Sequence, residues 1–538
     1  MGRSPETGLT PTLTPSPSPT QRAIDRLPAH LRRYVVGQDH GAYTPRDHAV
    51  WRHILQRLTG RLKGTAHASY LSGLAATGIG LERIPSLDEM NEKLEAMGWS
   101  AVGVRGFIPP AVFTELQSLG VLAIAADIRS HEHIEYTPAP DIVHESAGHA
   151  PILADRRYAE YLKRCGEAGF RAIASVEDQA VYEAIRNLSV VKEDPAATED
   201  EVRLAEERLR AASASRRYVS ESTKASRLYW WTAEYGLVGD LADPKLYGAG
   251  LLSSLGEAAH CLTPAVKKRP LSLICADTEY DITRMQPHLF VARDFDHLFE
   301  VLDAFEATLG WRRGGDHGLE EALRARTVNH LVLDDGLELT GKVVARIPAR
   351  GELAPGLSTA LAQVEGPIQL SRKGKAEGHP WPGEALVAFG SAALPHRGAF
   401  SLDLPSGLFL TGFRVGEHEV INLRGHQDGR PLDLPSWALL FLSAGLPSVA
   451  GGPSDPGAWD EWFGDHSALA EGEAEAQARD RKALALPEAI AALYVEVRTL
   501  RESGGIDENR LRTLTQRASA YPGEWLLHAE LRELEVVR

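Results

Sequence analysis

The sequence is poor in cysteine and has no long apolar run, and both absences narrow the class of protein. Only three cysteines, Cys165, Cys261 and Cys275, occur in 538 residues, and no two of them form a C-x-x-C pair. A disulfide framework is therefore not expected, and a reducing compartment fits the composition. No apolar run approaches the roughly 18 residues that span a membrane, and "MGRSPETGLTPTLTPSPSPT" lacks the apolar core of a secretory signal. We expect a cytoplasmic protein that has no membrane partner.

Acidic residues outnumber basic residues, which argues against nucleic acid as a partner. Lys and Arg total 58 against 73 Asp and Glu, for a formal net charge of −15. Binding to phosphates requires clustered basic residues, so no nucleic-acid partner is expected. The hydrophobic fraction of 43% is that of an ordinary globular protein. The length predicts about two to four domains.

The apolar pattern changes along the chain and divides it into four parts. Residues 1–22 are rich in Pro, Thr and Ser and are expected to form a disordered tail. Residues 23–318 space their apolar residues as helices do, and residues 319–455 alternate apolar and polar residues around Gly-containing turns. Residues 456–538 are helical again in pattern. The expected fold is a mostly α-helical first domain, a β-rich module of unknown role and a helical C-terminal segment.

A densely charged stretch interrupts the first domain at about residues 190–218. Within it, Thr198 and Glu201 have the spacing of a capping box, which predicts the start of a helix. The many charges on this helix predict that it is exposed to solvent. We expect a helical insertion on the surface of the domain.

The stretch "PDIVHESAGHAPI" contains two histidines at a spacing suited to a distorted helix. His144 and His149 are five residues apart, whereas the zinc-protease motif H-E-x-x-H separates its histidines by four. On a regular α-helix these two side chains would point about 140° apart. Gly148 and Pro151 favour an end or a distortion of the helix. The histidines then converge on one ion from a helix and its exit loop, unless one is a core residue and the other a surface residue.

A third ligand is expected from Glu234, which lies among aromatic residues in "RLYWWTAEYGLV". A carboxylate in such surroundings requires a cation, because its removal from water is costly. That cation is either a metal or the partner in an Arg or Lys salt bridge. Two histidines and one carboxylate form the facial triad of non-haem Fe(II) oxygenases, although zinc accepts the same ligands.

A second group of metal-ligand residues occurs in "RSHEHIEY", where His131, Glu132 and His133 are adjacent. This stretch is polar and has no apolar wall beside it. A solvated loop is the better interpretation of this stretch, and a second metal site is the alternative.

Four stretches resemble the pterin-dependent aromatic amino acid hydroxylases, the family of phenylalanine, tyrosine and tryptophan hydroxylases. They are "YTPAPDIVHESAGHAPILAD", "LYWWTAEYGL", "YGAGLLSSLGE" and "MQPHLFVARDF", in the family's order, within roughly residues 40–310. The resemblance implies that residues 23–318 form an iron- and pterin-dependent hydroxylase domain. It also implies Fe(II) and a tetrahydropterin, either tetrahydrobiopterin or a related reduced pterin, as cofactors.

Position by position, the resemblance implies specific roles. The metal ligands are His144, His149 and Glu234, and the catalytic glutamate near iron and pterin is Glu145. The pterin site comprises Gly106, Phe107, Phe113 and Tyr229. The amino-acid site comprises Arg129, Thr137, Trp230, Gly250 and Ser253. Arg129 would pair with the substrate carboxylate, although it could instead form only an ion pair with Asp141, and the aromatic residues could simply be core residues.

The activity implied by the resemblance is oxygenation of an aromatic amino acid ring with O₂, foremost L-phenylalanine to L-tyrosine. Tyrosine, tryptophan or another ring position remains an alternative substrate choice. Two other classes stay open: a metal-dependent hydrolase, and a binding protein that acts through its C-terminal module.

Some positions differ from the family pattern. Pro109 and Pro110 occupy places in the pterin loop where hydroxyl residues are common, and Ala123 replaces a usual histidine. His149 and Glu234 are separated by 84 residues, about twice the usual gap, and the charged insertion accounts for the surplus. These differences affect the expected pterin contacts more than the metal ligands.

Overall fold

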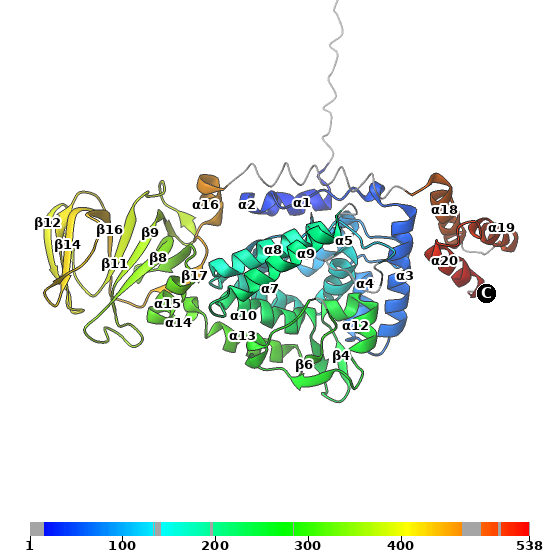
Figure 1. Cartoon of the computed structure of the whole chain (residues 1–538), viewed down its shortest axis with the longest axis horizontal. Coiled ribbons are helices and arrows are strands. Elements are labelled where there is room, and N and C mark those ends of the chain that lie inside the picture. Colours follow the sequence, from blue (N-terminus) through cyan, green and yellow to red (C-terminus); the bar gives the residue numbers. More distant parts are fainter. Residues whose placement is uncertain are drawn as a thin grey trace, which may run out of the picture.

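The computed structural model describes residues 16–132, 134, 141–193, 197–282, 284–464, 486–503 and 507–536. Figure 1 shows a helical region in the middle, a β-rich region at one end and a group of C-terminal helices at the other. None of the helices in these described ranges combines the length and the apolar character that crossing a membrane would demand.

The central region is built mainly from helices around one large apolar core. Its α-helices are α1 (Pro19–Arg26), α2 (Ala29–Arg32), α3 (Pro45–Leu62), α4 (Ser69–Ala76), α5 (Leu87–Leu94), α6 (Pro110–Ser118), α7 (Arg156–Arg171), α8 (Val176–Glu193), α9 (Glu199–Ala214), α10 (Glu221–Tyr229), α11 (Ala249–Ser253), α12 (Leu255–His260) and α13 (Phe295–Glu306). The longest buried helix, α3, begins with a capping box formed by Thr44 and Asp47. It buries Trp51, Ile54 and Leu58 in the core.

Two small sheets also belong to this region, so the description as mostly α is too loose. Strand β1 (Ser100–Val104) pairs in parallel with β2 (Val121–Ala125), and both are buried on both faces. A second sheet has the order β4-β3-β6-β5, formed by β4 (Pro244–Leu246), β3 (Leu237–Gly239), β6 (His288–Ala292) and β5 (Lys267–Pro270).

The β-rich region follows two short helices, α14 (Gly310–Arg313) and α15 (Gly315–Ala325), and forms one eleven-stranded sheet. Its strands are β7 (Asn329–Val332), β8 (Leu337–Pro348), β9 (Thr359–Arg372), β10 (Lys375–Ala376), β11 (Glu384–Phe389), β12 (Gly398–Asp403), β13 (Leu408–Arg414), β14 (Glu419–Gln427), β15 (Arg430–Pro431), β16 (Trp437–Ser443) and β17 (Ser448–Gly451). The hairpins predicted around Asp-Gly and Ser-Gly are confirmed as β7–β8 and β12–β13. Each needs a residue with positive φ in its turn, supplied by Gly336 and Gly407.

The C-terminal helices are α16 (Pro456–Phe463), α18 (Glu488–Glu502), α19 (Glu508–Ala518) and α20 (Trp525–Val536). Helices α18 and α20 pack against α3, and their leucines belong to the same core cluster as Leu55 and Leu58. A buried ion pair joins Arg52 of α3 to Glu530 of α20, and each side chain is only 1% exposed. Helices α18, α19 and α20 therefore extend the core of the central region.

Two predicted boundaries can be compared with the helices. Most of the tail expected at residues 1–22 lies outside the described residues, but α1 begins inside it at Pro19. Ser18 accepts a hydrogen bond from the Gln21 amide and Pro19 occupies the first turn, so a helix starts there. In the charged insertion, Thr198 and Glu201 form the predicted capping box at the start of α9. The domain boundaries themselves stay predictions.

Candidate metal centre

The two histidines lie on a single π-helical turn, Val143–His149. A π-helix bonds residue i to residue i+5, so side chains five apart lie near one another on the same face. The predicted distortion between His144 and His149 is therefore confirmed. The expected exit loop is wrong, because a 3₁₀ helix, Ala150–Ala154, with Pro151 in its first turn, follows directly.

The carboxylate is also carried by a π-helical turn. Residues Trp230–Glu234 continue α10 in π geometry, and the chain then turns into β3. Both ligand-bearing segments thus depart from α-helical geometry where they meet. Such π segments are rare and are often found at functional sites.

These two segments bring His144, His149 and Glu234 together. His144 Nε2 lies 3.2 Å from Glu234 Oε2, and His149 Nε2 lies 3.0 Å from Glu234 Oε1. One ligand atom of each residue lies within 4.8 Å of the others, and the two imidazole rings are perpendicular with centroids 5.1 Å apart. Within the described ranges, no other group of three such residues meets this criterion.

The hydrogen bonding of His149 fits a bound cation. Its side chain is only 1% exposed, yet neither ring nitrogen has a well-directed hydrogen bond, and Nε2 has only the ion-pair contact with Glu234 at 3.0 Å. Buried polar atoms are nearly always satisfied, so these nitrogens call for a further partner. A metal held by Nε2, together with His144 and Glu234, supplies one. The donor set of two imidazoles and a carboxylate fits Fe(II) and also zinc.

His144 is oriented by Ser253. The Ser253 hydroxyl donates to the Ala249 carbonyl at 2.7 Å, and its oxygen lies 3.0 Å from His144 Nδ1. Because that hydrogen is already donated, Ser253 accepts the Nδ1–H of His144. Nε2 then keeps its lone pair for a metal, which is the usual arrangement of ligating histidines.

Charge at the centre is unevenly distributed among buried groups. Burial alone would lower the pKa of His144, but the carboxylate of Glu234 outweighs this and raises it to about 9. The two histidines hold the pKa of Glu234 well below its usual range, against the effect of burial. Burial raises the pKa of Glu145, which is 7% exposed. A divalent cation would compensate the single negative charge of Glu234 directly.

Glycines let α11 approach both ligand segments. A Cβ at Gly148 would lie 2.7 Å from the Ala249 carbonyl oxygen, and one at Gly248 would lie 2.5 Å from the Glu234 carbonyl oxygen. A Cβ at Gly250 would meet the Tyr235 ring at 2.8 Å. Gly250, expected in the amino-acid site, therefore has a clear packing role.

Arg129 forms the ion pair that the sequence left open as an alternative. Its Nε and Nη2 donate to the two carboxylate oxygens of Asp141 at 2.7 and 2.8 Å, and both residues are buried. Asp141 also accepts the backbone N–H of His144, so it caps the π-helical turn. Arg129 is thus tied to the metal centre through Asp141, whatever else it binds.

Of the residues expected at the pterin site, Tyr229 lies near His149 and Phe113 packs on Tyr229. The Phe113 ring meets the Tyr229 ring edge-on at 5.7 Å, and the Tyr229 ring lies 6.3 Å from His149. Gly106 has a φ of +56°, which favours glycine in this loop. The Phe107 carbonyl accepts a hydrogen bond from the Tyr182 hydroxyl of α8 at 2.9 Å.

Trp230 stands in an aromatic stack with Tyr235 and Tyr280. Tyr235 stacks at 4.5 Å and Tyr280 at 4.2 Å, the latter nearly parallel. Thr137, expected in the same amino-acid site, lies outside the described residues.

Sequence reasoning missed Gln117, Tyr182 and Tyr280. The side-chain amide of Gln117 forms a hydrogen bond with the Tyr229 hydroxyl at 2.5 Å, and Gln117 is 2% exposed. Its position one turn after Phe113 on α6 was a readable signal, because residues four apart share a helix face. Tyr182 and Tyr280 come close only through the tertiary fold.

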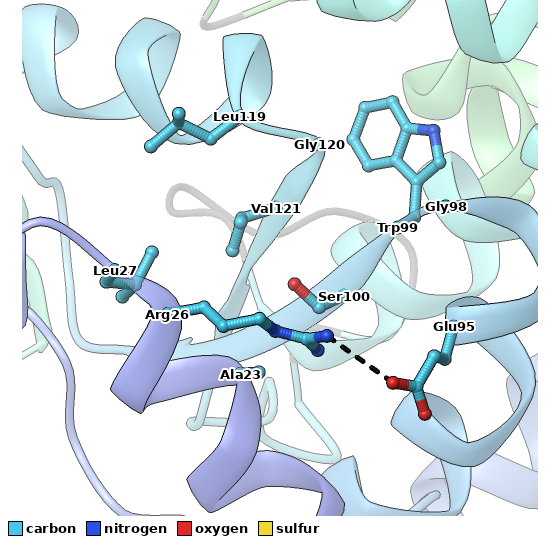
Figure 2. Close-up of a pocket in the computed structure, with 10 residues that line it drawn as sticks. All are labelled: Ala23, Arg26, Leu27, Glu95, Gly98, Trp99, Ser100, Leu119, Gly120 and Val121. Atoms are coloured by element: carbon cyan, nitrogen blue, oxygen red, sulfur yellow. Dashed lines mark hydrogen bonds and ion pairs between the residues drawn. The ribbon is translucent and has the colours of Figure 1, made fainter.

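Two other features lie away from the centre. His131 and Glu132 are in a turn and belong to no ligand group within the described residues, while His133 lies outside them. A cavity of about 280 Å³ lies between α1 and the β1–β2 strands, beside Trp99 and the Arg26–Glu95 ion pair (Figure 2). It shares no residue with the metal centre.

Fold and site together define a helical protein with a buried centre of two histidines and one carboxylate. The family model of biopterin-dependent aromatic amino acid hydroxylases matches residues 32–185 and 208–313. The unmatched residues 186–207 fall at the end of α8 and in α9, the charged insertion. The chain belongs to this family and is a pterin-dependent aromatic amino acid monooxygenase.

Individual relatives are similar over the same half of the chain. Phenylalanine-4-hydroxylase of Pseudomonas aeruginosa is 31% identical over 275 residues, which cover 50% of this chain and 88% of the relative. Phenylalanine-4-hydroxylase of Chromobacterium violaceum is 28% identical over 289 residues, 53% of this chain and 82% of the relative. A crystal structure of the latter enzyme with iron(III) and 7,8-dihydrobiopterin aligns at 27% identity and a TM-score of 0.41, covering 54% of this chain and 92% of that one.

Proposed function

We propose that this protein hydroxylates L-phenylalanine to L-tyrosine with Fe(II), O₂ and a tetrahydropterin. The observation that carries the proposal is the convergence of His144, His149 and Glu234, with ligand atoms within 4.8 Å of one another. Family membership supplies the pterin, and the relatives named phenylalanine-4-hydroxylase support phenylalanine as the substrate.

His144, His149 and Glu234 would hold the iron and leave its other positions open, as a facial triad does. When bound, Fe(II) and the reduced pterin supply the activation of O₂. Ser253 keeps the lone pair of His144 Nε2 directed at the metal. Glu145 lies between the two histidines in the sequence, and its side chain is buried. It is the proposed catalytic carboxylate beside the pterin.

Aromatic residues would shape the two binding places. Phe113 and Tyr229 form the proposed pterin wall next to His149. The stack of Tyr235, Trp230 and Tyr280 would form an aromatic wall for the substrate ring. Arg129 would bind the substrate carboxylate, although Asp141 already occupies its Nε and Nη2.

A reducing, cytoplasmic location is part of the proposal. All three cysteines are buried, free thiols, which suits such a compartment. The substrates would be an aromatic amino acid and O₂.

The decisive experiment is an anaerobic reconstitution of the full chain with Fe(II) and tetrahydrobiopterin, or with Zn(II) in place of iron. Oxygen is then admitted with phenylalanine, tyrosine or tryptophan in separate reactions, and products are read by mass spectrometry. Glu234→Ala serves as the inactive control, since it removes one metal ligand and leaves the fold in place.

Tyrosine formed from phenylalanine, dependent on both iron and pterin, supports the proposal. Oxygenation of tyrosine or tryptophan in preference to phenylalanine would correct the substrate. Full iron content and activity in Glu234→Ala would remove Glu234 from the ligand set.

A further inference from the structure

Gln117 lies on the face of α6 that contacts Tyr229. It follows Phe113 by one helical turn, so both side chains point the same way. Phe113 contacts the edge of the Tyr229 ring, while the Gln117 amide contacts the Tyr229 hydroxyl at 2.5 Å. Two residues of α6 therefore hold the same tyrosine, one by its ring and one by its oxygen.

The backbone of α7 holds Gln117 in place. A Cβ at Gly166 would lie 2.8 Å from the Gln117 Cβ and 2.7 Å from both the Ser118 amide nitrogen and the Thr114 carbonyl oxygen. Only a glycine permits this close approach of α7 to α6. Gln117 is consequently 2% exposed, and its amide has little room to choose another partner.

The length of the contact with Tyr229 indicates which atoms meet. A separation of 2.5 Å is short for N–H···O but normal for O–H···O, for which about 2.5–3.0 Å is usual. The orientation of a glutamine amide is an assignment, because its oxygen and nitrogen are alike in shape. The distance favours the orientation in which the Tyr229 hydroxyl donates to the amide oxygen of Gln117.

The amide atom of Gln117 that does not contact Tyr229 indicates that a ligand binds nearby. The amide atom that does not meet Tyr229, Oε1 before the exchange of oxygen and nitrogen and Nε2 after it, is buried and has no hydrogen-bond partner. Buried amides are nearly always satisfied on both atoms, and an exception commonly marks a place that a ligand or water completes. This atom lies on the helix that carries Phe113, the residue expected to stack on the pterin.

We propose that Gln117 is a positioning residue for the pterin, an inference that rests on the proposed function. It fixes the Tyr229 hydroxyl, and through it the ring that stands 6.3 Å from His149 and forms the pterin wall. Without this hydrogen bond the Tyr229 ring would retain its place in the aromatic cluster but would no longer be held in one orientation. Pterin binding and the yield of product per pterin oxidised would then fall, while iron stays bound.

The test uses Gln117→Met, which keeps the length of the side chain, together with Gln117→Leu, Tyr229→Phe and the double variant Gln117→Met with Tyr229→Phe. Gln179→Met, exposed on α8, is the matched control. Tetrahydrobiopterin is titrated anaerobically into each iron-loaded protein by calorimetry. Product formed per pterin oxidised, iron content and thermal midpoint are measured alongside.

Gln117→Met is expected to weaken pterin binding roughly 3- to 10-fold, the size of one net hydrogen bond, and to lower the product yield per pterin. Iron content and the phenylalanine KM stay unchanged, and the double variant is no worse than Tyr229→Phe alone. Unchanged pterin affinity in both Gln117 variants overturns the role of Gln117, as does additive loss in the double variant. Absence of pterin binding and turnover in the unaltered protein overturns the proposed function and this inference with it.

Discussion

The two histidines of the centre are held by different means. The Nδ1 of His144 is fixed by a hydrogen bond to Ser253, whereas the Nδ1 of His149 has no partner, and that buried ring is held by packing and by its contact with Glu234. A ring held in this way keeps its orientation only while its neighbours stay in place. Substitutions at Ser253 and around His149 should therefore affect iron binding by separate routes.

Ser253→Ala is expected to weaken iron binding by about 10-fold or more, because loss of a ligand's outer hydrogen bond typically costs 10–100-fold in metal affinity. The variant removes the acceptor for His144 Nδ1–H and leaves the buried helix α11 otherwise intact. Iron affinity is measured by anaerobic titration. Ser226→Ala, exposed on α10, is the control, and equal affinities for the two variants would contradict the role of Ser253.

Arg129→Lys is expected to lower stability as well as substrate affinity. Lysine cannot reproduce the two parallel hydrogen bonds to Asp141, and the weakened pair is buried. Loss of one partner in a buried pair costs about 3–5 kcal/mol, and lysine, which retains the charge, should cost less than that. Urea unfolding gives the stability, and the phenylalanine KM gives the binding role. A raised KM at unchanged stability would assign Arg129 to substrate alone.

At the scale of elements, the metal centre depends on two π-helical turns packed on α11. The five-residue spacing of His144 and His149 was enough to predict that the helix could not be regular. It could not specify a π turn, because that geometry depends on the contact of Gly148 with Ala249, two residues far apart in sequence. The aromatic run around Glu234 predicted a buried acid but not its π geometry, for the same reason.

Gly148→Ala is expected to reduce iron content strongly. The added Cβ would lie 2.7 Å from the Ala249 carbonyl oxygen, so either α11 or the π turn with His149 must move. Gly60→Ala in α3 is the matched control, since nothing lies within 4 Å of its Cβ and alanine favours a helix by about 1 kcal/mol. Metal analysis after reconstitution distinguishes the two, and full iron content in Gly148→Ala would show that the turn is adaptable.

Helix α10 carries a pH-sensitive anchor at the end opposite the metal ligand. Glu221 accepts the backbone N–H groups of Ile173 and Gly310 at 3.0 and 2.7 Å. Burial raises its pKa to about 7, and these two hydrogen bonds only partly oppose the shift. The folded protein therefore holds a proton that the unfolded chain has released, between about pH 4.5 and 7.

This raised pKa predicts a loss of stability with rising pH. The contribution of Glu221 is fully present below about pH 4.5 and falls by about 1.4 kcal/mol per pH unit up to about pH 7. Glu221→Gln removes that slope, whatever constant offset its amide introduces. Urea unfolding at pH 5 and pH 7.5 should show that the free energy of unfolding of the variant, relative to that of the unaltered protein, is higher at pH 7.5 than at pH 5. Parallel pH profiles would mean that Glu221 is already ionised at pH 5.

At the scale of the whole molecule, the C-terminal helices are joined to the central region by buried charge. Arg52 donates to Glu530 at 2.5 Å and to the Glu82 carbonyl at 2.6 Å, and it is almost fully buried. Arg46 and Glu524 form a second pair between the same parts. The sequence indicated helices near residue 490 but not their position, because charged residues far apart in sequence give no sign of their pairing.

Glu530→Ala is expected to destabilise the protein by about 3–5 kcal/mol, since it leaves Arg52 buried without its partner. Glu535→Ala, exposed on the same helix, should change stability little. The double variant Arg52→Met with Glu530→Leu should be much more stable than Glu530→Ala, because an apolar pair of similar size can replace a buried ion pair. Denaturant unfolding measures all four proteins, and a small effect of Glu530→Ala would mean that water reaches Arg52.

A fragment ending near residue 320 is consequently a poor test of the hydroxylase domain by itself. The cut would remove the β-rich region together with α18 and α20, and α3 would expose Leu55 and Leu58 beside an Arg52 that keeps only its contacts with Glu82. An internal deletion that keeps residues 486–536 separates the two contributions better. The predicted boundary at residue 318 therefore needs testing with the C-terminal helices present.

The pairing of Arg52 with Glu530 also sets an order of events during synthesis. The two residues are separated by 478 positions. At about 5–20 residues per second, Arg52 is translated roughly 25 to 95 seconds before its partner. Once Glu234 has been translated, the nascent metal-binding region has all three ligands but still lacks Glu530 and the rest of its core. Chaperone demand should thus be greatest in this window, and slower translation of the β-rich region would prolong it.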